Sequence, residues 1–168
     1  AIHTHVNQIK EYLSDPSRIS YCDANEHYLS DWTKKYSVKE AIVVKPISTE
    51  EVSAVMRYAH DHYIQVVPQG GNTGLVGGSV PRTSGCIIIS MEKMNQIVDI
   101  DKINSVVTLE AGVVLEHLDN ILKQDDTGLM IPIDLGAKGS CQIGGNLSTN
   151  AGGLNVVKYG GIKNYLLG

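Results

Sequence analysis

Two glycine-rich stretches do most to constrain what this chain can fold into. The first, residues 68–79, reads PQGGNTGLVGGS and places five glycines within nine positions. Glycine destabilises helices and strands, and it permits positive φ and a close approach of the backbone to a ligand. We therefore expect a loop whose successive N–H groups point at one anion, with Asn72, Thr73 and Ser79 adding side-chain donors.

The second stretch, residues 132–153, reads PIDLGAKGSCQIGGNLSTNAGG and holds six glycines between Gly136 and Gly153. Its hydroxyl and amide donors are neutral, and Lys138 is its one basic residue. Such a set suits a bulky dinucleotide that also lies against apolar atoms better than a freely exchanging phosphate. We interpret both stretches as ligand-binding loops; the alternative is that each is an ordinary turn.

Neither stretch matches a standard nucleotide motif. A P-loop requires GxxxxGK[ST], and the first stretch contains no lysine. The dinucleotide fingerprint GxGxxG also fails, because the spacing here is GGxxGxxGG. The residues therefore predict an anion cradle without naming its class, and a domain that binds an anion other than a flavin stays open as an alternative.

A βαβ unit is predicted ahead of the first glycine loop. Residues 41–45 and 64–67 have the pattern of strands. Between them, a helix over about 50–62 begins at the capping residues Ser48 and Thr49. Its apolar face is expected to consist of Val52, Val55, Met56 and Ala59. Strands joined through a helix run parallel, so we expect these two to be neighbours in one sheet.

The pattern changes to closely spaced strands after the first loop. Residues 86–90, 96–100 and 104–110 read as strands separated by short polar turns, which favours antiparallel pairing. A second amphipathic helix is expected over 113–124. Together with the βαβ unit, this predicts an α+β fold.

The start of the chain is expected to be a helical lead-in, residues 1–34, followed by a domain over 35–168. Residues 6–13 have a weak amphipathic pattern, and a polar stretch follows it up to Trp32. We expect Trp32 to lie in the core; the alternative is an aromatic ring that stacks on a flavin.

Composition excludes several classes of function. Fourteen basic and eighteen acidic residues give a net charge of −4, whereas a nucleic-acid-binding domain needs a basic face. No apolar run approaches the roughly 18 to 20 residues of a membrane span. Cys22, Cys86 and Cys141 are scattered, which argues against a disulfide framework and a CxxC site.

No metal site is expected in this sequence. The histidines show neither HxxxH nor HExxH spacing, and His3 and His5, close to the N-terminus, are expected to be solvated. The acidic pairs are interpreted as cap and turn residues rather than as catalytic groups; they are Glu50 with Glu51 and Asp99 with Asp101.

The two glycine-rich strings carry a family resemblance. PQGGNTGLVGGSVP at 68–81 and PIDLGAKGSCQIGGNLSTNAGG at 132–153 resemble the FAD-linked oxidase family of the vanillyl-alcohol oxidase and p-cresol methylhydroxylase type. Within that family the chain is most similar to the D-lactate and D-2-hydroxyglutarate dehydrogenases, some of whose relatives are named actin-interacting proteins. The resemblance covers roughly 31–168. It implies a FAD-binding domain of two small α+β subdomains with the flavin between them.

The resemblance also implies which residues bind FAD. In the first loop, around the pyrophosphate, they are Pro68, Gly70, Gly71, Asn72, Thr73, Gly74, Leu75, Gly78 and Ser79. In the second, along the ribityl chain and isoalloxazine, they are Pro132, Leu135, Gly139, Ser140, Gly144, Gly145, Ser148 and Asn150. Relatives that hold flavin covalently use His or Cys. No His lies in either stretch, so noncovalent FAD is implied, and Cys141 is interpreted as a small buried thiol.

The implied activity is oxidation of a D-2-hydroxyacid, D-lactate or D-2-hydroxyglutarate, to a 2-oxoacid. In relatives the catalytic base and a metal site lie in substrate and cap regions further along, so no catalytic residue is assigned here. Lys163-Asn164 stands where relatives tend to have His-Gly, which bears on the exact subfamily. The electron acceptor stays open between cytochrome c and an electron-transfer flavoprotein, and the compartment between mitochondrial matrix and cytosol. Another oxidase of the family and an actin-interacting scaffold are the alternatives.

Overall fold

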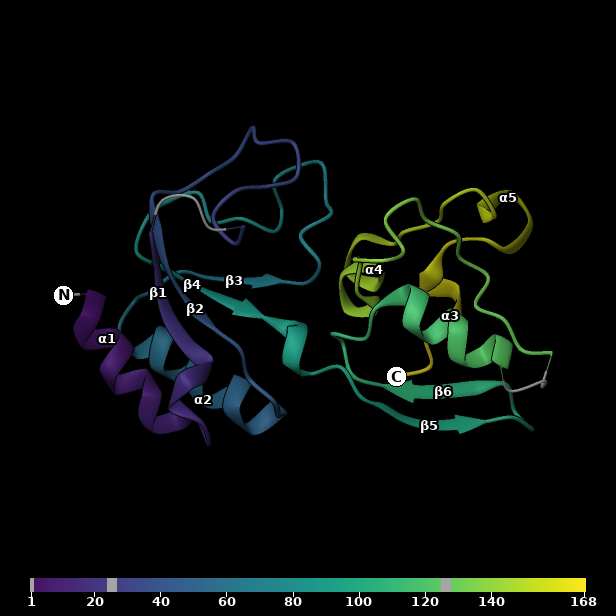
Figure 1. Cartoon of the computed structure of the whole chain (residues 1–168), viewed down its shortest axis with the longest axis horizontal. Coiled ribbons are helices and arrows are strands. Elements are labelled where there is room, and N and C mark those ends of the chain that lie inside the picture. The colour runs from purple at the N-terminus through teal and green to yellow at the C-terminus, as the bar shows by residue number, and fades with distance from the viewer. Residues whose placement is uncertain (1, 24–26, 125–127) are drawn as a thin grey trace. The chain divides into compact units, whose positions relative to one another are not determined.

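The computed structural model describes residues 2–23, 27–124 and 128–168, which form two compact units (Figure 1). The first unit is Ala1–Met94 and the second is Asn95–Gly168. Each mixes helices with a small sheet, which confirms the predicted α+β class. No helix within the described ranges is long and apolar enough to cross a membrane.

The first unit contains a four-stranded sheet in the order β1-β2-β4-β3. Its strands are β1 (Ile19–Asp23), β2 (Glu40–Val44), β3 (Val66–Gln69) and β4 (Cys86–Ser90). β1 is antiparallel to β2, whereas β2 and β3 both run parallel to β4. The side chains of β4 are buried throughout, which is what a central strand covered on both faces requires.

Helices cover one face of this sheet. They are α1 (Ile2–Ile9), which continues into a 3-10 turn (Lys10–Tyr12), and α2 (Thr49–Asp61), with a further 3-10 turn at Pro16–Arg18 (Figure 1). Ser48 caps α2 by accepting a hydrogen bond from the backbone N–H of Glu51 at 3.2 Å, as the sequence predicted. The core on this side joins residues of alternate positions in the strands to both helices: Val6, Ile9, Leu13, Ile19, Ile42, Val44, Val55, Tyr58, Ala59, Ile87 and Ile89.

The other face of the sheet packs against the segment that follows residues 24–26. Tyr28 and Leu29 join the intervening strand residues in a second cluster with Cys22, Ala41, Val43 and Ile88. This segment and the loop after β3 lie at the same end of the sheet (Figure 1). The first glycine loop is thus carried by a sheet that is covered on both sides.

Several expectations for the first unit were wrong. β2 and β3 are parallel but not neighbours, because β4 lies between them and contributes its apolar side chains to both faces. β4 is therefore not part of an antiparallel arrangement with the strands that follow. The expected lead-in is not only helical, because residues 19–23 form β1 at the edge of the sheet. Trp32 is exposed rather than in the core, and Met56 points away from the core while Tyr58 is buried.

The second unit is built on a hairpin and a helix. β5 (Ile97–Asp101) pairs antiparallel with β6 (Val106–Leu109), which confirms the predicted pairing, and a 3-10 turn (Met91–Lys93) ends the first unit. Asp101 Oδ1 accepts the N–H groups of Ile103 and Asn104 at 3.0 and 2.9 Å, so its expected turn role is confirmed. The helix α3 (Leu115–Gln124) buries the predicted apolar face through Leu115, Leu118 and Leu122.

The remainder of the second unit holds three short helical pieces. They are α4 (Ile143–Thr149), α5 (Val156–Tyr159) and a 3-10 turn (Ile162–Tyr165). The second glycine-rich stretch is therefore not one loop, since seven of its residues form α4. Ile143 and Leu147 lie four apart on this helix and pack into the core of the unit, and this burial outweighs the low helix propensity of the glycines between them.

Candidate functional site

The first glycine loop leaves β3 after Gln69; residues 74–76 and 78 are exposed and the others of 70–79 are half-buried. Pro68 still belongs to the strand, so the loop proper begins at Gly70. Among the described residues, no backbone N–H of residues 70–79 donates a hydrogen bond within the protein. A Cβ added at Gly74 or Gly78 would meet no atom within 4 Å, so the space beside both is open. The loop therefore offers a series of uncommitted N–H groups to a ligand.

Two predicted side-chain donors of this loop are engaged inside the protein. Asn72 has φ +53°, and its amide nitrogen donates to the carbonyl oxygens of His27 and Ser30 at 2.9 and 2.8 Å. Its Oδ1 accepts from the Ser79 hydroxyl at 2.6 Å. Both side chains therefore bind the protein itself, and the backbone is left as the main source of donors.

The second stretch is divided among a segment, a turn and a helix. In the turn, Cys141 N donates to Ala137 O at 2.8 Å, and Gly139 and Ser140 are exposed just before it. On α4, Gly145 is exposed with open space where a Cβ would stand. These three positions are exposed, as are Ser148 and Asn150 among the other predicted binders of this unit.

Other predicted residues of the second stretch have internal contacts. Gly144 lies against the neighbouring segment, since a Cβ there would be 2.7 Å from Ala111 Cβ and 2.9 Å from its carbonyl oxygen. The Ser148 hydroxyl donates to Gly144 O at 2.8 Å. Asn150 ends α4 with φ +52°, and its Oδ1 accepts the N–H of Lys163 at 3.2 Å. These residues shape α4 and its end, whatever else they contact.

Gln142 is a candidate that the sequence analysis missed. It stands at the N-cap of α4 and is buried, and its Oε1 has no hydrogen-bond partner within the described parts of the chain. A buried acceptor without a partner is unusual and calls for a donor from outside these residues. Nothing in the local sequence distinguishes it from other glutamines, because the signal is its burial.

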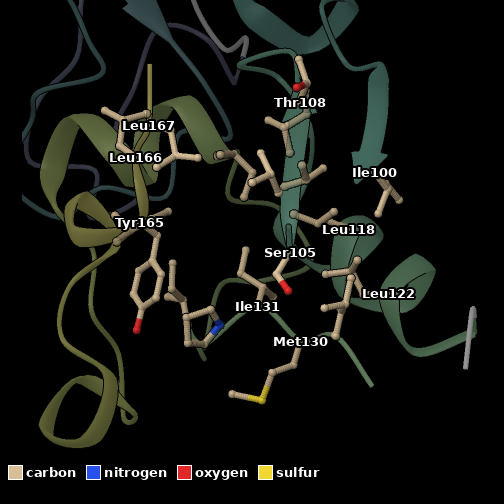
Figure 2. A pocket seen from close by; sticks show the side chains of 18 of the residues that line it. Ile100, Ser105, Thr108, Leu118, Leu122, Met130, Ile131, Tyr165, Leu166 and Leu167 are labelled. Carbon is tan, nitrogen blue, oxygen red and sulfur yellow. The ribbon is translucent and has the colours of Figure 1, made fainter. Parts of the chain in front are cut away.

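A cavity of about 800 Å³ in the second unit is separate from most of these positions. Its wall is mostly apolar, with Leu118 and Leu122 of α3 on one side and Tyr165, Leu166 and Leu167 on another (Figure 2). Pro132 lines it, but the other predicted binders of the unit do not. The structure therefore does not bring the whole second set together in this cavity, and Leu135 lies in the core beside it.

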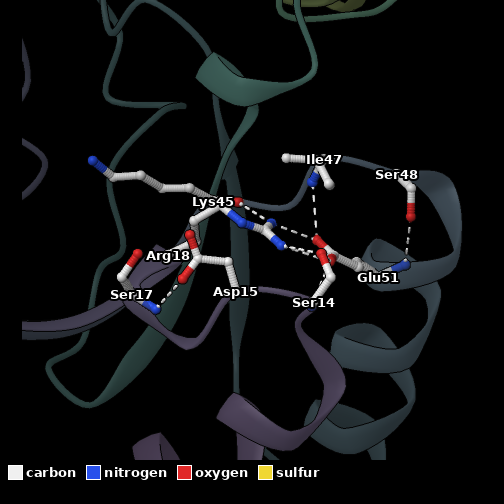
Figure 3. Close-up of polar contacts among 8 residues, drawn as sticks. All are labelled: Ser14, Asp15, Ser17, Arg18, Lys45, Ile47, Ser48 and Glu51. Carbon is white, nitrogen blue, oxygen red and sulfur yellow. Dashed lines mark hydrogen bonds and ion pairs between the residues drawn. The ribbon is translucent and has the colours of Figure 1, made fainter.

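The strongest charged cluster lies in the first unit, away from both glycine stretches in sequence. Arg18 and Glu51 form a two-pronged ion pair, and Ser14 and the N–H of Ile47 add hydrogen bonds to the same carboxylate (Figure 3). The guanidinium holds the pKa of Glu51 well below its usual range, against the opposing effect of burial. Glu51 is thus a buried partner of Arg18 and not simply a cap residue, which corrects the sequence interpretation.

His5 is half-buried rather than solvated, whereas His3 is exposed, as expected. His5 Nδ1 is 2.7 Å from the Tyr58 hydroxyl, and His62 stacks on the same ring with 4.0 Å between centroids. No group of three or more His, Cys, Asp or Glu side chains suited to a metal occurs among the residues that the structure covers. Cys141 is buried, as expected, and burial raises the pKa of its thiol.

The sequence of the chain matches a known protein family. The sequence profile of the family described as FAD binding domain matches residues 40–168. The chain belongs to this family. Both glycine stretches lie within the matched residues.

Curated relatives are similar over nearly the whole chain. The D-2-hydroxyglutarate dehydrogenase, mitochondrial, of Arabidopsis thaliana is 43% identical over 97% of this chain. The protein of that name from Danio rerio is 48% identical over 82%, and a Schizosaccharomyces pombe protein provisionally named a mitochondrial D-lactate dehydrogenase is 49% identical over 82%. The chain spans 29%, 25% and 26% of these relatives, respectively.

Solved structures show the same fold at low identity. An alkyldihydroxyacetonephosphate synthase matches with a TM-score of 0.80 and 23% identity over 96% of this chain and 34% of its own. A variant of the BBE-like 1 protein of Physcomitrella patens matches with a TM-score of 0.72 and 17% identity over 95% of this chain and 34% of its own. This likeness supports the fold alone.

The exposed features of both units fit FAD. The N–H groups of residues 70–79 suit a pyrophosphate, since an anion can be held by backbone donors without a cationic side chain. The open positions at Gly74, Gly78 and Gly145 allow a ligand to approach the backbone closely. Gln142 Oε1 is buried rather than exposed, and as an acceptor without a partner at the N-cap of α4 it would be satisfied by a ligand N–H or O–H that reaches it.

Proposed function

We propose that this chain binds FAD noncovalently and forms the FAD-binding part of a D-2-hydroxyacid dehydrogenase. The observation that carries the activity is the 43–48% identity to relatives named D-2-hydroxyglutarate dehydrogenase. D-2-hydroxyglutarate is therefore the substrate we favour. D-lactate is second, because the Schizosaccharomyces pombe relative carries that name.

The first loop would hold the pyrophosphate of FAD. The N–H groups at Gly70, Gly71, Thr73 and Gly74 have no other described acceptor, and Gly78 leaves open space. Leu75 is largely exposed and could lie against an apolar part of the ligand. Because no cation is required, binding should depend only weakly on salt compared with recognition by Lys or Arg.

The second set would hold the remainder of the flavin. Gly139, Ser140 and Gly145 are exposed, and Gln142 offers its unpartnered Oε1. When bound, FAD supplies the acceptor for a hydride from the carbon that carries the substrate hydroxyl. The residues of this chain would bind and orient the cofactor and exclude water from it.

Noncovalent attachment is supported by the residues available. Neither glycine stretch contains a histidine, and Cys141 is buried with a raised thiol pKa. A thiol in that state is a poor nucleophile. We propose a mitochondrial location from the names of the relatives, and an electron carrier rather than oxygen as the acceptor.

The absorption spectrum of the purified protein tests the cofactor. Flavin bands that pass into the supernatant after acid precipitation would establish noncovalent FAD. Bands that stay with the pellet would contradict noncovalent binding, and a colourless protein that gains no colour with added FAD would contradict flavin binding altogether.

Anaerobic bleaching tests the substrate. D-2-hydroxyglutarate should bleach the flavin faster than D-lactate, with the two L-enantiomers as controls.

The Gln142→Leu variant should bind FAD at least several-fold more weakly, because the FAD group that donates to Gln142 Oε1 would lose its hydrogen bond. Unchanged affinity in that variant would remove Gln142 from the site.

A further inference from the structure

The polar side chains of the first loop form a connected internal network. Gln69, the last residue of β3, is 1% exposed, and its Nε2 donates to the carbonyl oxygens of Tyr28 and Ser79 at 3.0 and 2.8 Å. Asn72 is bonded to the same two segments, as described above. Two amides therefore tie the start and the end of the loop to each other and to the segment around Tyr28.

The segment that receives these bonds is itself well fixed. Asp31 is 2% exposed, and its carboxylate accepts the N–H of Tyr36 at 2.9 Å and that of Thr33 at 3.2 Å. The backbone closes the same turn, since Val38 N donates to Leu29 O at 2.9 Å and Asp31 N to Tyr36 O at 3.0 Å. The loop is thus held against a rigid support.

We propose that Gln69, Asn72 and Ser79 form an internal clamp that holds residues 70–79 in the shape that binds the cofactor. Asn72 and Ser79 are then positioning residues, and the backbone N–H groups between them contact the anion. This inference rests on the proposed FAD-binding function. It departs from the interpretation that these two side chains contact the flavin directly.

The composition of the loop makes a clamp necessary. Five glycines within nine positions give the unbound loop many accessible backbone conformations, and only some of them point the N–H groups at one place. When a binding-competent state is only partly populated, the apparent affinity falls by that fraction. The clamp would raise the population of the binding-competent loop conformation without using any backbone N–H group of the loop.

The internal hydrogen bonds of Asn72 support positioning over donation to the ligand. Its two amide hydrogens are donated to carbonyl oxygens and its oxygen accepts from Ser79. Because an amide has two donor hydrogens, a direct bond from Asn72 to the ligand would require one of these bonds to break. Ser79 is in the same position, since its hydroxyl hydrogen is committed to Asn72.

A double-mutant cycle on FAD affinity separates the two interpretations. The variants are Asn72→Gly, Ser79→Ala and the double variant of the whole protein, titrated as apoprotein with FAD. Asn72→Gly retains a residue that tolerates positive φ while removing the side chain. We expect roughly tenfold weaker binding for Asn72→Gly and about threefold for Ser79→Ala. In the Asn72→Gly background, Ser79→Ala should have no further effect, because its partner is already gone.

Matched controls account for folding and for the substitutions themselves. Tyr63→Gly places glycine at another position with φ near +55° in the same unit, where the side chain is almost fully exposed. Ser53→Ala makes the same chemical change as Ser79→Ala on an exposed position of α2. Both controls should bind FAD like the wild-type protein.

Hydrogen exchange of the apoproteins provides a readout that needs no flavin. Peptides covering 70–79 and 27–38 should exchange faster in Asn72→Gly than in wild type, while β2 and β4 remain protected. Equal loss of FAD affinity from Ser79→Ala in both backgrounds, or unchanged exchange in these peptides, would overturn the clamp. If the wild-type protein bound no FAD but the exchange result held, the proposed function would fail while the clamp on the loop stood.

Discussion

Breaking the Arg18–Glu51 pair should destabilise the first unit more than any exposed ion pair would. The two side chains are 10% and 9% exposed, and they join the 3-10 turn before β1 to the first turn of α2. Removal of one partner of a buried pair typically costs about 3–5 kcal/mol, because the other charge is left buried. In Arg18→Met the Glu51 carboxylate keeps three donors, from Ser14 and Ile47, so we expect the low end, about 3 kcal/mol.

Urea unfolding followed by circular dichroism measures this loss. The control is Lys123→Met, which removes an exposed i,i+4 partner of Asp119 and should cost no more than about 0.5 kcal/mol. A loss in Arg18→Met of less than about 1 kcal/mol, the value of a surface pair, would refute the argument that burial makes this pair important.

Three further predictions follow from the described contacts. The pKa of Glu51 is lower in the folded protein than its ordinary value of 4.5, so the stability this carboxylate contributes is complete above pH 4.5 and is lost as the pH falls further. The free energy of unfolding, measured against pH below 4.5, should therefore fall more steeply in the wild-type protein than in Arg18→Met. Gly144→Ala should lower stability by about 1–3 kcal/mol through overpacking. Gly145→Ala, at an exposed helix position with open space, should raise stability by up to about 1 kcal/mol through helix propensity while it weakens FAD binding, as thermal unfolding and flavin titration would show. Cys141 should react with a thiol reagent far more slowly in the native than in the unfolded protein, and equal rates would contradict its burial.

The helices α2 and α3 and the two glycine-rich stretches could be located from the sequence because their signals are local, whereas α4, inside the second stretch, could not. Ser48 and the apolar spacing after it define α2, and Leu115, Leu118 and Leu122 define α3. Glycine density located both candidate binding stretches, since few structures other than loops and close contacts tolerate it. Both stretches lie within residues 40–168, which the family profile matches.

The order of the strands could not be predicted, because pairing depends on residues far apart in the chain. The apolar pattern of 86–90 fits a buried strand anywhere, and only the packing places it between β2 and β3. β1 was missed because its buried residues, Ile19 and Cys22, are three apart and do not alternate. An edge strand of five residues needs little apolar character to pair.

The hydrogen-bond partners and the burial of the site side chains could not be predicted from the sequence either. Asn72 and Ser79 are hydrogen-bond donors by chemistry. Asn72 donates to a segment some forty residues earlier in the chain, and Ser79 donates to Asn72. Gln142 differs from an ordinary glutamine only in its burial. The Asp31 carboxylate accepts hydrogen bonds from the N–H and hydroxyl of Thr33 and from the N–H of Tyr36. Asp31 therefore occupies the interior, and the neighbouring Trp32 is exposed.

The central position of β4 has a consequence for how the protein is made. β2 can pair with β1 at once, but it emerges from the ribosome well before β4, its other neighbour in the sheet, and β3 likewise waits for residues 86–90. Until then the nascent chain carries two unpaired apolar strand edges and an unsupported glycine loop. Long-range parallel pairing of this kind is slow to form, so a pause in translation before residues 86–90 have left the ribosome would expose these strands to aggregation, whereas a pause after they have emerged would not.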